Sequence, residues 1–156
     1  MPSTFFHGPK MVQPSDQPPS TPRSFWESEI LANAVIGGAI RVHRALGPGL
    51  LESAYEACLA HELTKLGIPT RRQVAVPLRY DSIALDVGYR LDLLVDEQLI
   101  LELKCVDRLD RVHMAQVMTY LRLSGVRVGL LINFNEAMVK NGLRRIVNRY
   151  DDPGRV

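Results

Sequence analysis

Three ionisable residues lie within otherwise apolar stretches of the chain. Asp92 stands in the run 91–95, Glu102 stands in the run 99–103, and Lys104 directly follows the second run. Because side chains alternate along a strand, Glu102 and Lys104 should project from the same face. Burying an isolated charge is costly, and proteins accept it when charges are paired or bind a metal ion. The pattern therefore predicts either a buried ion pair or a site for a divalent cation.

Whether Asp92 and Glu102 can meet depends on the turn that joins their two strands. The segments on either side of Asp96-Glu97 are expected to pair as a hairpin. A three-residue loop, 96–98, or a bulge places Asp92 directly across from Glu102. A two-residue turn would place Asp92 opposite Leu101, on the other face of the sheet. A metal site here therefore predicts one particular register.

Two further segments carry candidate polar residues. Gln116 and Tyr120 are neighbours on one face of a predicted helix, and His113 lies one turn earlier on nearly the same face. Glu52 stands beside the apolar stripe of an earlier helix, with Tyr55 three residues later. Each pattern alone also fits ordinary surface residues, and a carboxylate near a helix N-terminus is favoured by the helix dipole. Their significance comes from their combination with the Glu-x-Lys pair.

The elements that must position these residues alternate between helical and strand periodicity. The predicted helices span 24–46, 50–66 and 110–124, and the predicted strands span 73–80, 83–95, 99–104 and 126–134. Ser24 and Glu27 form a capping-box pattern, and a bend is expected at Gly88. Residues 136–148 fit either a short helix or a turn with an edge strand. One antiparallel meander and one crossover predict an α/β fold with a mixed central sheet flanked by helices.

Composition limits the domain organisation and the partner. Residues 1–23 hold six of the ten prolines, so a disordered or loosely packed leader is expected there. Residues 24–150 form the predicted folded domain, and 151–156 a flexible tail. The formal net charge is only +2. A nucleic-acid partner would therefore have to be recognised mainly through the site rather than through a strongly basic surface.

The cysteines and the apolar runs bear on the compartment. Cys58 and Cys105 each stand in an apolar run and are expected to be buried free thiols in a reducing compartment. Charged residues interrupt every apolar stretch before it is long enough to cross a membrane, and no signal-peptide pattern opens the chain. The sequence therefore predicts a cytoplasmic protein.

These motifs together resemble those of the PD-(D/E)XK nuclease superfamily. The resemblance is carried by Gly88…Asp92, Glu102-Leu103-Lys104 and Gln116-x-x-x-Tyr120, the last being similar to the RecB-like exonuclease branch. The stretch from about Ile30 to Asn148 more closely resembles small bacterial proteins called the GxxxExxY family. The segments that carry this second resemblance are 46–55, 102–104 and 129–134. The literal G-x-x-x-E spacing is not met, because position 48 is proline.

The resemblance implies a restriction-endonuclease-like αβββαβ core with an extra N-terminal helix. It also implies hydrolysis of phosphodiester bonds in nucleic acid, with DNA as the expected substrate, Mg²⁺ as the expected metal ion and Mn²⁺ as a substitute. The implied metal ligands are Asp92, Glu102 and Glu52; the implied catalytic residues are Lys104, Glu102, Asp92, Gln116 and Tyr120; and the implied substrate-binding residues are Arg90, Tyr55 and His113.

Two other interpretations of the same residues remain open. The domain could be a non-catalytic module on the same scaffold that binds nucleic acid or another protein, because a fold does not determine a function. Alternatively, Glu102 and Lys104 could form a purely structural ion pair. The resemblance also leaves a homodimer open.

Overall fold

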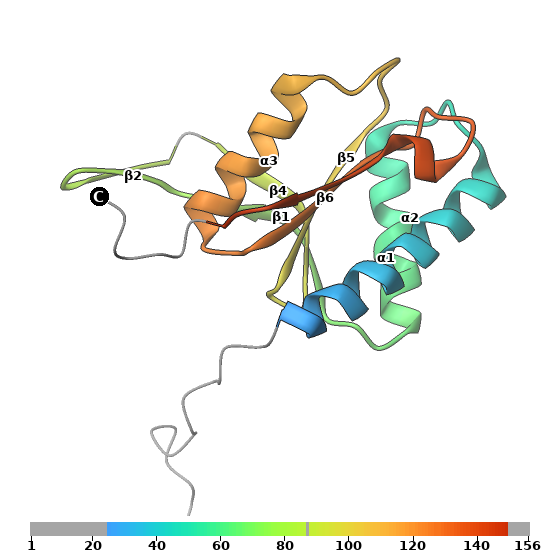
Figure 1. Ribbon diagram of the computed structural model, residues 1–156, viewed down its shortest axis with the longest axis horizontal. Helices are drawn as coiled ribbons and strands as arrows, with labels where there is room; N and C mark the ends of the chain where they lie inside the picture. The colour runs from blue at the N-terminus through green and yellow to red at the C-terminus, as the bar shows by residue number, and fades with distance from the viewer. Residues whose placement is uncertain (1–24, 87, 150–156) are drawn as a thin grey trace, which may run out of the picture.

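A computed structural model describes residues 25–86 and 88–149 of the chain, without the side chains of Phe25 and Trp26 (Figure 1). The predicted leader 1–23, the capping residue Ser24 and the predicted tail 151–156 lie outside the described residues.

The order of helices and strands follows the prediction with two additional strand breaks. The elements are α1 (Phe25–Leu46), α2 (Glu52–Lys65), β1 (Thr70–Ala75), β2 (Leu78–Tyr80), β3 (Ile83–Leu85), β4 (Arg90–Val95), β5 (Leu99–Lys104), α3 (Arg111–Ser124), β6 (Val128–Asn133), the 3₁₀ helix η2 (Val139–Gly142) and β7 (Leu143–Val147). The main sheet has the order β1-β4-β5-β6-β7, and β2 and β3 form a separate two-stranded sheet. β5 and β6 are parallel, whereas the other neighbours are antiparallel. The fold is therefore an α/β fold with a mixed central sheet, as predicted.

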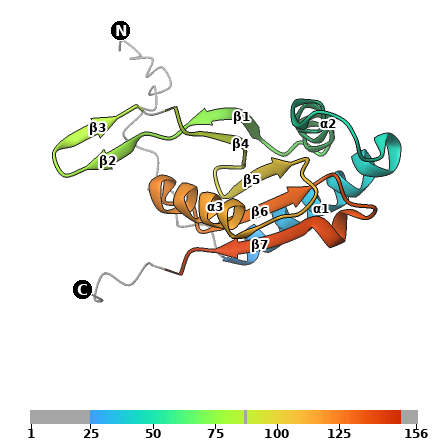
Figure 2. The ribbon, with the colours of Figure 1, turned by 90° about the horizontal axis from the view of Figure 1, so that it is seen from above.

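Helices cover both faces of this sheet (Figure 2). α1 and α2 pack on one face, where Val35, Leu59 and Leu101 belong to one buried cluster. α3 packs on the other face, where Val117 and Leu121 join Ile100 in a second cluster. Burial of these two apolar clusters is the main stabilising contribution expected for such a layered domain.

The central strand β5 carries the predicted site at its C-terminal end. Five of its six residues are buried and Lys104 is half-buried. The chain leaves β5, forms α3 and returns as β6 parallel to β5, which is a crossover connection. β5 contacts α1 and α2 on one face and α3 on the other, so helices from both layers pack against the strand that carries the predicted site.

The two predicted strands 73–80 and 83–95 are each split into two. β1 stops at Ala75 and β2 begins at Leu78, because Pro77 between them cannot donate a ladder hydrogen bond. Gly88, with φ of 77°, lies between β3 and β4. The β2–β3 hairpin therefore points away from α1 and α2 instead of extending the main sheet (Figure 2).

The C-terminal part resolves an ambiguity in the sequence. Within residues 136–148, the short helix η2 is followed by the edge strand β7, so the segment combines a helical turn with an edge strand. Within the described part of the chain both cysteines are free and half-buried. No helix there is both long and apolar enough to span a bilayer.

α3 lies close to β6 at one position that lacks a side chain. A methyl group added at Gly129 would lie 2.7 Å from a γ carbon of Val117. Gly129 is therefore required by close packing of the helix on the sheet rather than by backbone conformation.

Candidate metal and catalytic site

The register of the β4–β5 hairpin agrees with the one that a metal site requires. Val95 pairs with Leu99 and Leu93 with Leu101, so residues 96–98 form a three-residue loop. Continuing this register by one residue brings Asp92 opposite Glu102. The ladder opens there, and the Asp92 Oδ2 atom accepts a hydrogen bond of 2.8 Å from the backbone N–H of Leu103.

Glu102 is the most deeply buried carboxylate of this group. Its side chain is 5% exposed, and its Oε1 atom lies 3.4 Å from Nζ of Lys104. Its Oε2 atom is buried and has no hydrogen-bond partner among the described residues. Burial, followed by the negative charge of Asp92, raises the pKa of Glu102 to about 8. These surroundings therefore disfavour the ionised form of Glu102 unless a cation is added.

Asp92 is subject to the same forces to a smaller degree. Burial raises its pKa, and the nearby charges of Glu56 and Glu52 add to the rise. The hydrogen bond from Leu103 and the ammonium group of Lys104 act in the opposite direction. Two neighbouring carboxylates with raised pKa values are a common feature of functional sites.

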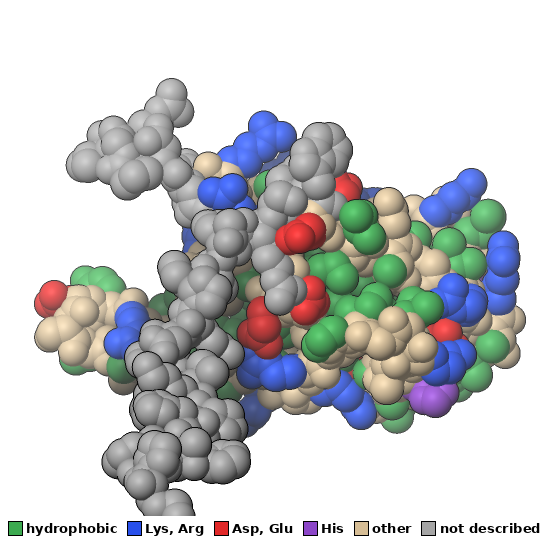
Figure 3. Space-filling view, turned by 90° about the horizontal axis from the view of Figure 1, so that it is seen from below, with side chains coloured by type: hydrophobic (Ala, Val, Ile, Leu, Met, Phe, Trp, Pro, Cys, Tyr) green, Lys and Arg blue, Asp and Glu red, His purple; other side chains and the backbone are tan. Residues whose placement is uncertain are grey.

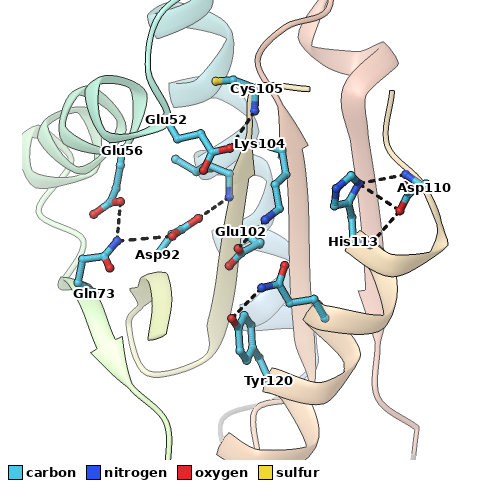
Figure 4. A network of polar contacts seen from close by, with 12 residues as sticks. Glu52, Glu56, Gln73, Asp92, Glu102, Lys104, Cys105, Asp110, His113 and Tyr120 are labelled. Atoms are coloured by element: carbon cyan, nitrogen blue, oxygen red, sulfur yellow. Dashed lines mark hydrogen bonds and ion pairs between the residues drawn. The ribbon is translucent and has the colours of Figure 1, made fainter. Parts of the chain in front are cut away.

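Tyr120 lies beside Glu102 (Figure 4). The Nε2 atom of Gln116 donates a hydrogen bond of 2.9 Å to the Tyr120 hydroxyl. Burial, followed by the charge of Glu102, raises the pKa of Tyr120. The hydroxyl therefore stays protonated near neutral pH. Because the oxygen already accepts from Gln116, its own hydrogen is available to another acceptor.

Glu52 approaches the site from the first turn of α2. Its Oε1 atom accepts a hydrogen bond of 3.3 Å from the backbone N–H of Cys105. Glu52 and Asp92 both line a cavity of about 570 Å³, and the other lining residues are Leu50, Leu51, Ser53, Glu56, Gln73 and Cys105. Across residues 25–86 and 88–149, no three His, Cys, Asp or Glu side chains lie close enough to hold a metal ion together. Glu52 thus shares a cavity with Asp92 without forming a ready-made three-ligand centre.

The sequence of this region matches a family model. Residues 29–146, well over half of the chain, match the model described as the PD-(D/E)XK nuclease superfamily. The chain belongs to this superfamily. No curated protein matches the sequence significantly. Among solved structures, an alkaline exonuclease (LHK-Exo) from Laribacter hongkongensis is similar with a TM-score of 0.40 and 14% identity, over 78% of this chain and 82% of that one.

Tyr55 does not lie where a substrate-binding residue would be expected. Tyr55 was expected to bind substrate, but in this PD-(D/E)XK domain it is fully buried and stacks on Phe134 with ring centroids 4.4 Å apart. Its hydroxyl donates to the carbonyl oxygen of Gly47 and accepts from the backbone N–H of Leu50. Tyr55 therefore anchors the loop that leads to Glu52, and its burial leaves no room for direct substrate contact.

The other two expected substrate-binding residues lie at the edges of the site. His113 caps α3: its Nδ1 atom accepts from the backbone N–H of Asp110, whose side chain accepts from the N–H groups of Val112 and His113. Arg90 is exposed at the start of β4 and donates to the carbonyl oxygen of Gln73. His113 thus has a structural role at the helix start, whereas the guanidinium group of Arg90 is accessible to solvent.

Two polar residues close to Asp92, namely Glu56 and Gln73, are not indicated by the pattern of charges in apolar strands. Glu56 is buried on α2, and its two carboxylate oxygens accept hydrogen bonds from Arg72 at 3.0 Å and Gln73 at 2.8 Å. Gln73 also lies 3.5 Å from Oδ1 of Asp92. The available signal for Glu56 was its spacing of four residues from Glu52, which places both on one face of a helix.

Proposed function

We propose that this protein is a metal-dependent nuclease that hydrolyses phosphodiester bonds in nucleic acid, with DNA as the expected substrate. The observation that carries the proposal is the charge of Asp92 acting on Glu102, which lies next to Lys104 and whose Oε2 atom is buried with no hydrogen-bond partner among the described residues. A purely structural ion pair would be expected to satisfy both oxygens of so deeply buried a carboxylate.

The charges around the site fit a divalent cation. Four carboxylates, Glu52, Glu56, Asp92 and Glu102, gather near two cations, Arg72 and Lys104. Two negative charges therefore remain uncompensated when all four carboxylates are ionised, which matches the charge of one Mg²⁺ or Mn²⁺. Asp92 and Glu102 would hold the ion, with Glu52 as an additional ligand through water, because Mg²⁺ prefers few carboxylates and several waters. When bound, such an ion neutralises a phosphate and lowers the pKa of a bound water.

The remaining side chains of the site can orient the reactants. Lys104 is 17% exposed, so its ammonium group can donate hydrogen bonds to a phosphate oxygen or an attacking water while it stays close to Glu102. The Tyr120 hydroxyl, held by Gln116, can donate its hydrogen to a second phosphate oxygen. Arg90, exposed beside the site, can contact a neighbouring phosphate of the same strand.

Several finer points belong to the same proposal. We place the protein in the GxxxExxY group of the superfamily, because Tyr55 anchors the loop that leads to Glu52. The domain boundaries near residues 24 and 150, a cytoplasmic location and a homodimer are retained from the sequence as parts of the proposal.

The decisive experiment compares two lysine substitutions in a cleavage assay. Lys104→Ala should lower the rate of Mg²⁺-dependent cleavage at least about a hundredfold while the thermal unfolding midpoint stays within a few degrees. The matched control is Lys65→Ala, because Lys65 pairs with Glu62 on the outer face of α2. A panel of single- and double-stranded DNA and RNA would define the substrate. Equal cleavage by the wild type and Lys104→Ala would refute the assignment.

A further inference from the structure

The β1–β4 ladder is interrupted beside the candidate metal site. Arg72 pairs with Leu93 and Val74 with Leu91, yet Gln73 and Asp92, which lie between these pairs, are not joined in the ladder. Gln73 has a φ of 51°, a left-handed conformation that costs free energy for a residue other than glycine. Strain of this kind persists only where other interactions stabilise it, and it is concentrated at functional sites.

This conformation directs the Gln73 amide between two carboxylates (Figure 4). Its Nε2 atom lies 2.8 Å from Oε2 of Glu56 and 3.5 Å from Oδ1 of Asp92, so one amide group faces acids from two other elements. The second oxygen of Asp92 is already held by the backbone N–H of Leu103. The Asp92 carboxylate is therefore oriented from both sides, by β1 and by β5.

Glu56 in turn holds the amide in place. Its other oxygen accepts from Nε of Arg72, the residue immediately before Gln73, and the Glu56 side chain is 6% exposed. Two successive residues of β1 are thus attached to one buried acid on α2. Swapping the oxygen and nitrogen of the Gln73 amide would set its oxygen against the carboxylates, so the donor orientation is the favourable one.

We propose that Gln73 is a positioning residue of the metal site, which uses its left-handed backbone to hold the Asp92 carboxylate for the ion. This inference rests on the proposed function, because it assigns Asp92 as a ligand. A positioning role for Gln73 can be distinguished from a purely structural role. The strained backbone of Gln73 lowers the stability of the fold, whereas its amide group orients Asp92 for metal binding.

Two substitutions separate these effects. Gln73→Gly removes the hydrogen bond to Glu56 but relieves the backbone, so its thermal midpoint in EDTA should be higher than that of Gln73→Met, which loses the same hydrogen bond and keeps the strain. Calorimetric titration with Mn²⁺ should nevertheless show an affinity about tenfold weaker, and cleavage should slow by a similar factor. Gln73→Met keeps the length and the strain but has no donor. It should lose the same metal affinity without any gain in midpoint.

Asp81→Gly is the matched control, because Asp81 also has a φ of 51° but lies in the turn between β2 and β3. It should raise or preserve the midpoint and leave Mn²⁺ affinity and cleavage unchanged. Unchanged Mn²⁺ affinity in both Gln73 variants, beside an active wild type, would overturn this inference and leave the proposed function standing. A wild type that binds Mn²⁺ without cleaving any substrate would overturn the nuclease assignment while the affinities still test Gln73. A wild type that does neither would overturn both.

Discussion

Because Glu102 is buried, its ionisation near neutral pH should depend on whether a cation is bound beside it. The pKa of this carboxyl rises from its ordinary value of 4.5 to about 8, first through burial and then through the charge of Asp92. The folded, metal-free protein therefore holds this proton more tightly than the unfolded chain does. The corresponding stabilisation is complete below about pH 4.5 and disappears as the pH rises through 8.

This raised pKa predicts a pH-dependent effect of Glu102→Gln. The variant is neutral at every pH, so between pH 5 and pH 9 in EDTA it should gain free energy of unfolding relative to the wild type. The expected gain is on the order of 3 kcal/mol. Urea denaturation at both pH values measures it. Parallel pH profiles of the two proteins would show that the carboxyl is not perturbed.

At the residue scale, sequence patterns revealed the strand acids but not their neighbours. Asp92, Glu102 and Lys104 could be recognised because a charge in an apolar strand conflicts with burial. Gln73 and Glu56 are not unusual in this way. Gln73 is exposed on β1, and Glu56 lies on an amphipathic helix, where polar residues are common. Their roles arise from contacts between β1, β4 and α2, which local periodicity does not encode.

At the scale of elements, the loop before α2 depends on one hydroxyl group. The Tyr55 hydroxyl donates a hydrogen bond to the carbonyl of Gly47 and accepts one from the N–H of Leu50. These residues lead to Glu52 at the start of α2. The Glu-x-x-Tyr spacing thus links a carboxylate of the site to the buried residue that positions it.

Removing this hydroxyl should loosen the loop without breaking the stacking. Tyr55→Phe retains the ring on Phe134 but removes the hydrogen bonds to the carbonyl of Gly47 and the N–H of Leu50, which should cost about 1–2 kcal/mol in unfolding free energy. Cleavage should slow as Glu52 becomes less ordered. Chemical denaturation and the cleavage assay measure both effects, with Tyr80→Phe at an exposed position as the control. Equal stability of the Tyr55 and Tyr80 variants would contradict this role.

Element prediction succeeded where periodicity and end signals agreed. The helix 110–124 was expected from its pattern, and in the structure Asp110 caps α3 and Gly125, with φ of 73°, ends it. The two long strands 73–80 and 83–95 were wrong in detail. Apolar residues continue through Pro77 and Gly88, so the pattern alone could not show that the hairpin beyond them leaves the main sheet.

At the scale of the whole molecule, the low net charge argues against strong non-specific binding to nucleic acid. On the described part of the face in Figure 3, basic, acidic and apolar side chains are interspersed and do not form one large basic patch. The formal net charge of +2 agrees with this distribution. Binding should therefore depend on the site and its metal ion more than on counterion release.

This surface predicts a shallow salt dependence. Raising NaCl from about 50 to 200 mM should weaken binding of a short DNA by less than about a hundredfold, because few phosphates are neutralised. Fluorescence anisotropy with the Lys104→Ala variant in Mg²⁺ measures affinity without cleavage. A loss of a thousandfold or more would indicate an extended basic interface instead.

The contact between Gly129 and Val117 has a consequence for related sequences. The absence of one methyl group on β6 sets how closely α3 approaches the sheet, and Gln116 is the residue next to Val117. Gly129→Ala should displace the helix because valine is stiff about its first side-chain torsion, and Val117→Ala in the same chain should restore the fit. Across homologues, a side chain at position 129 is accordingly expected to co-vary with a smaller residue at position 117, because these two positions together set how closely α3 approaches the sheet.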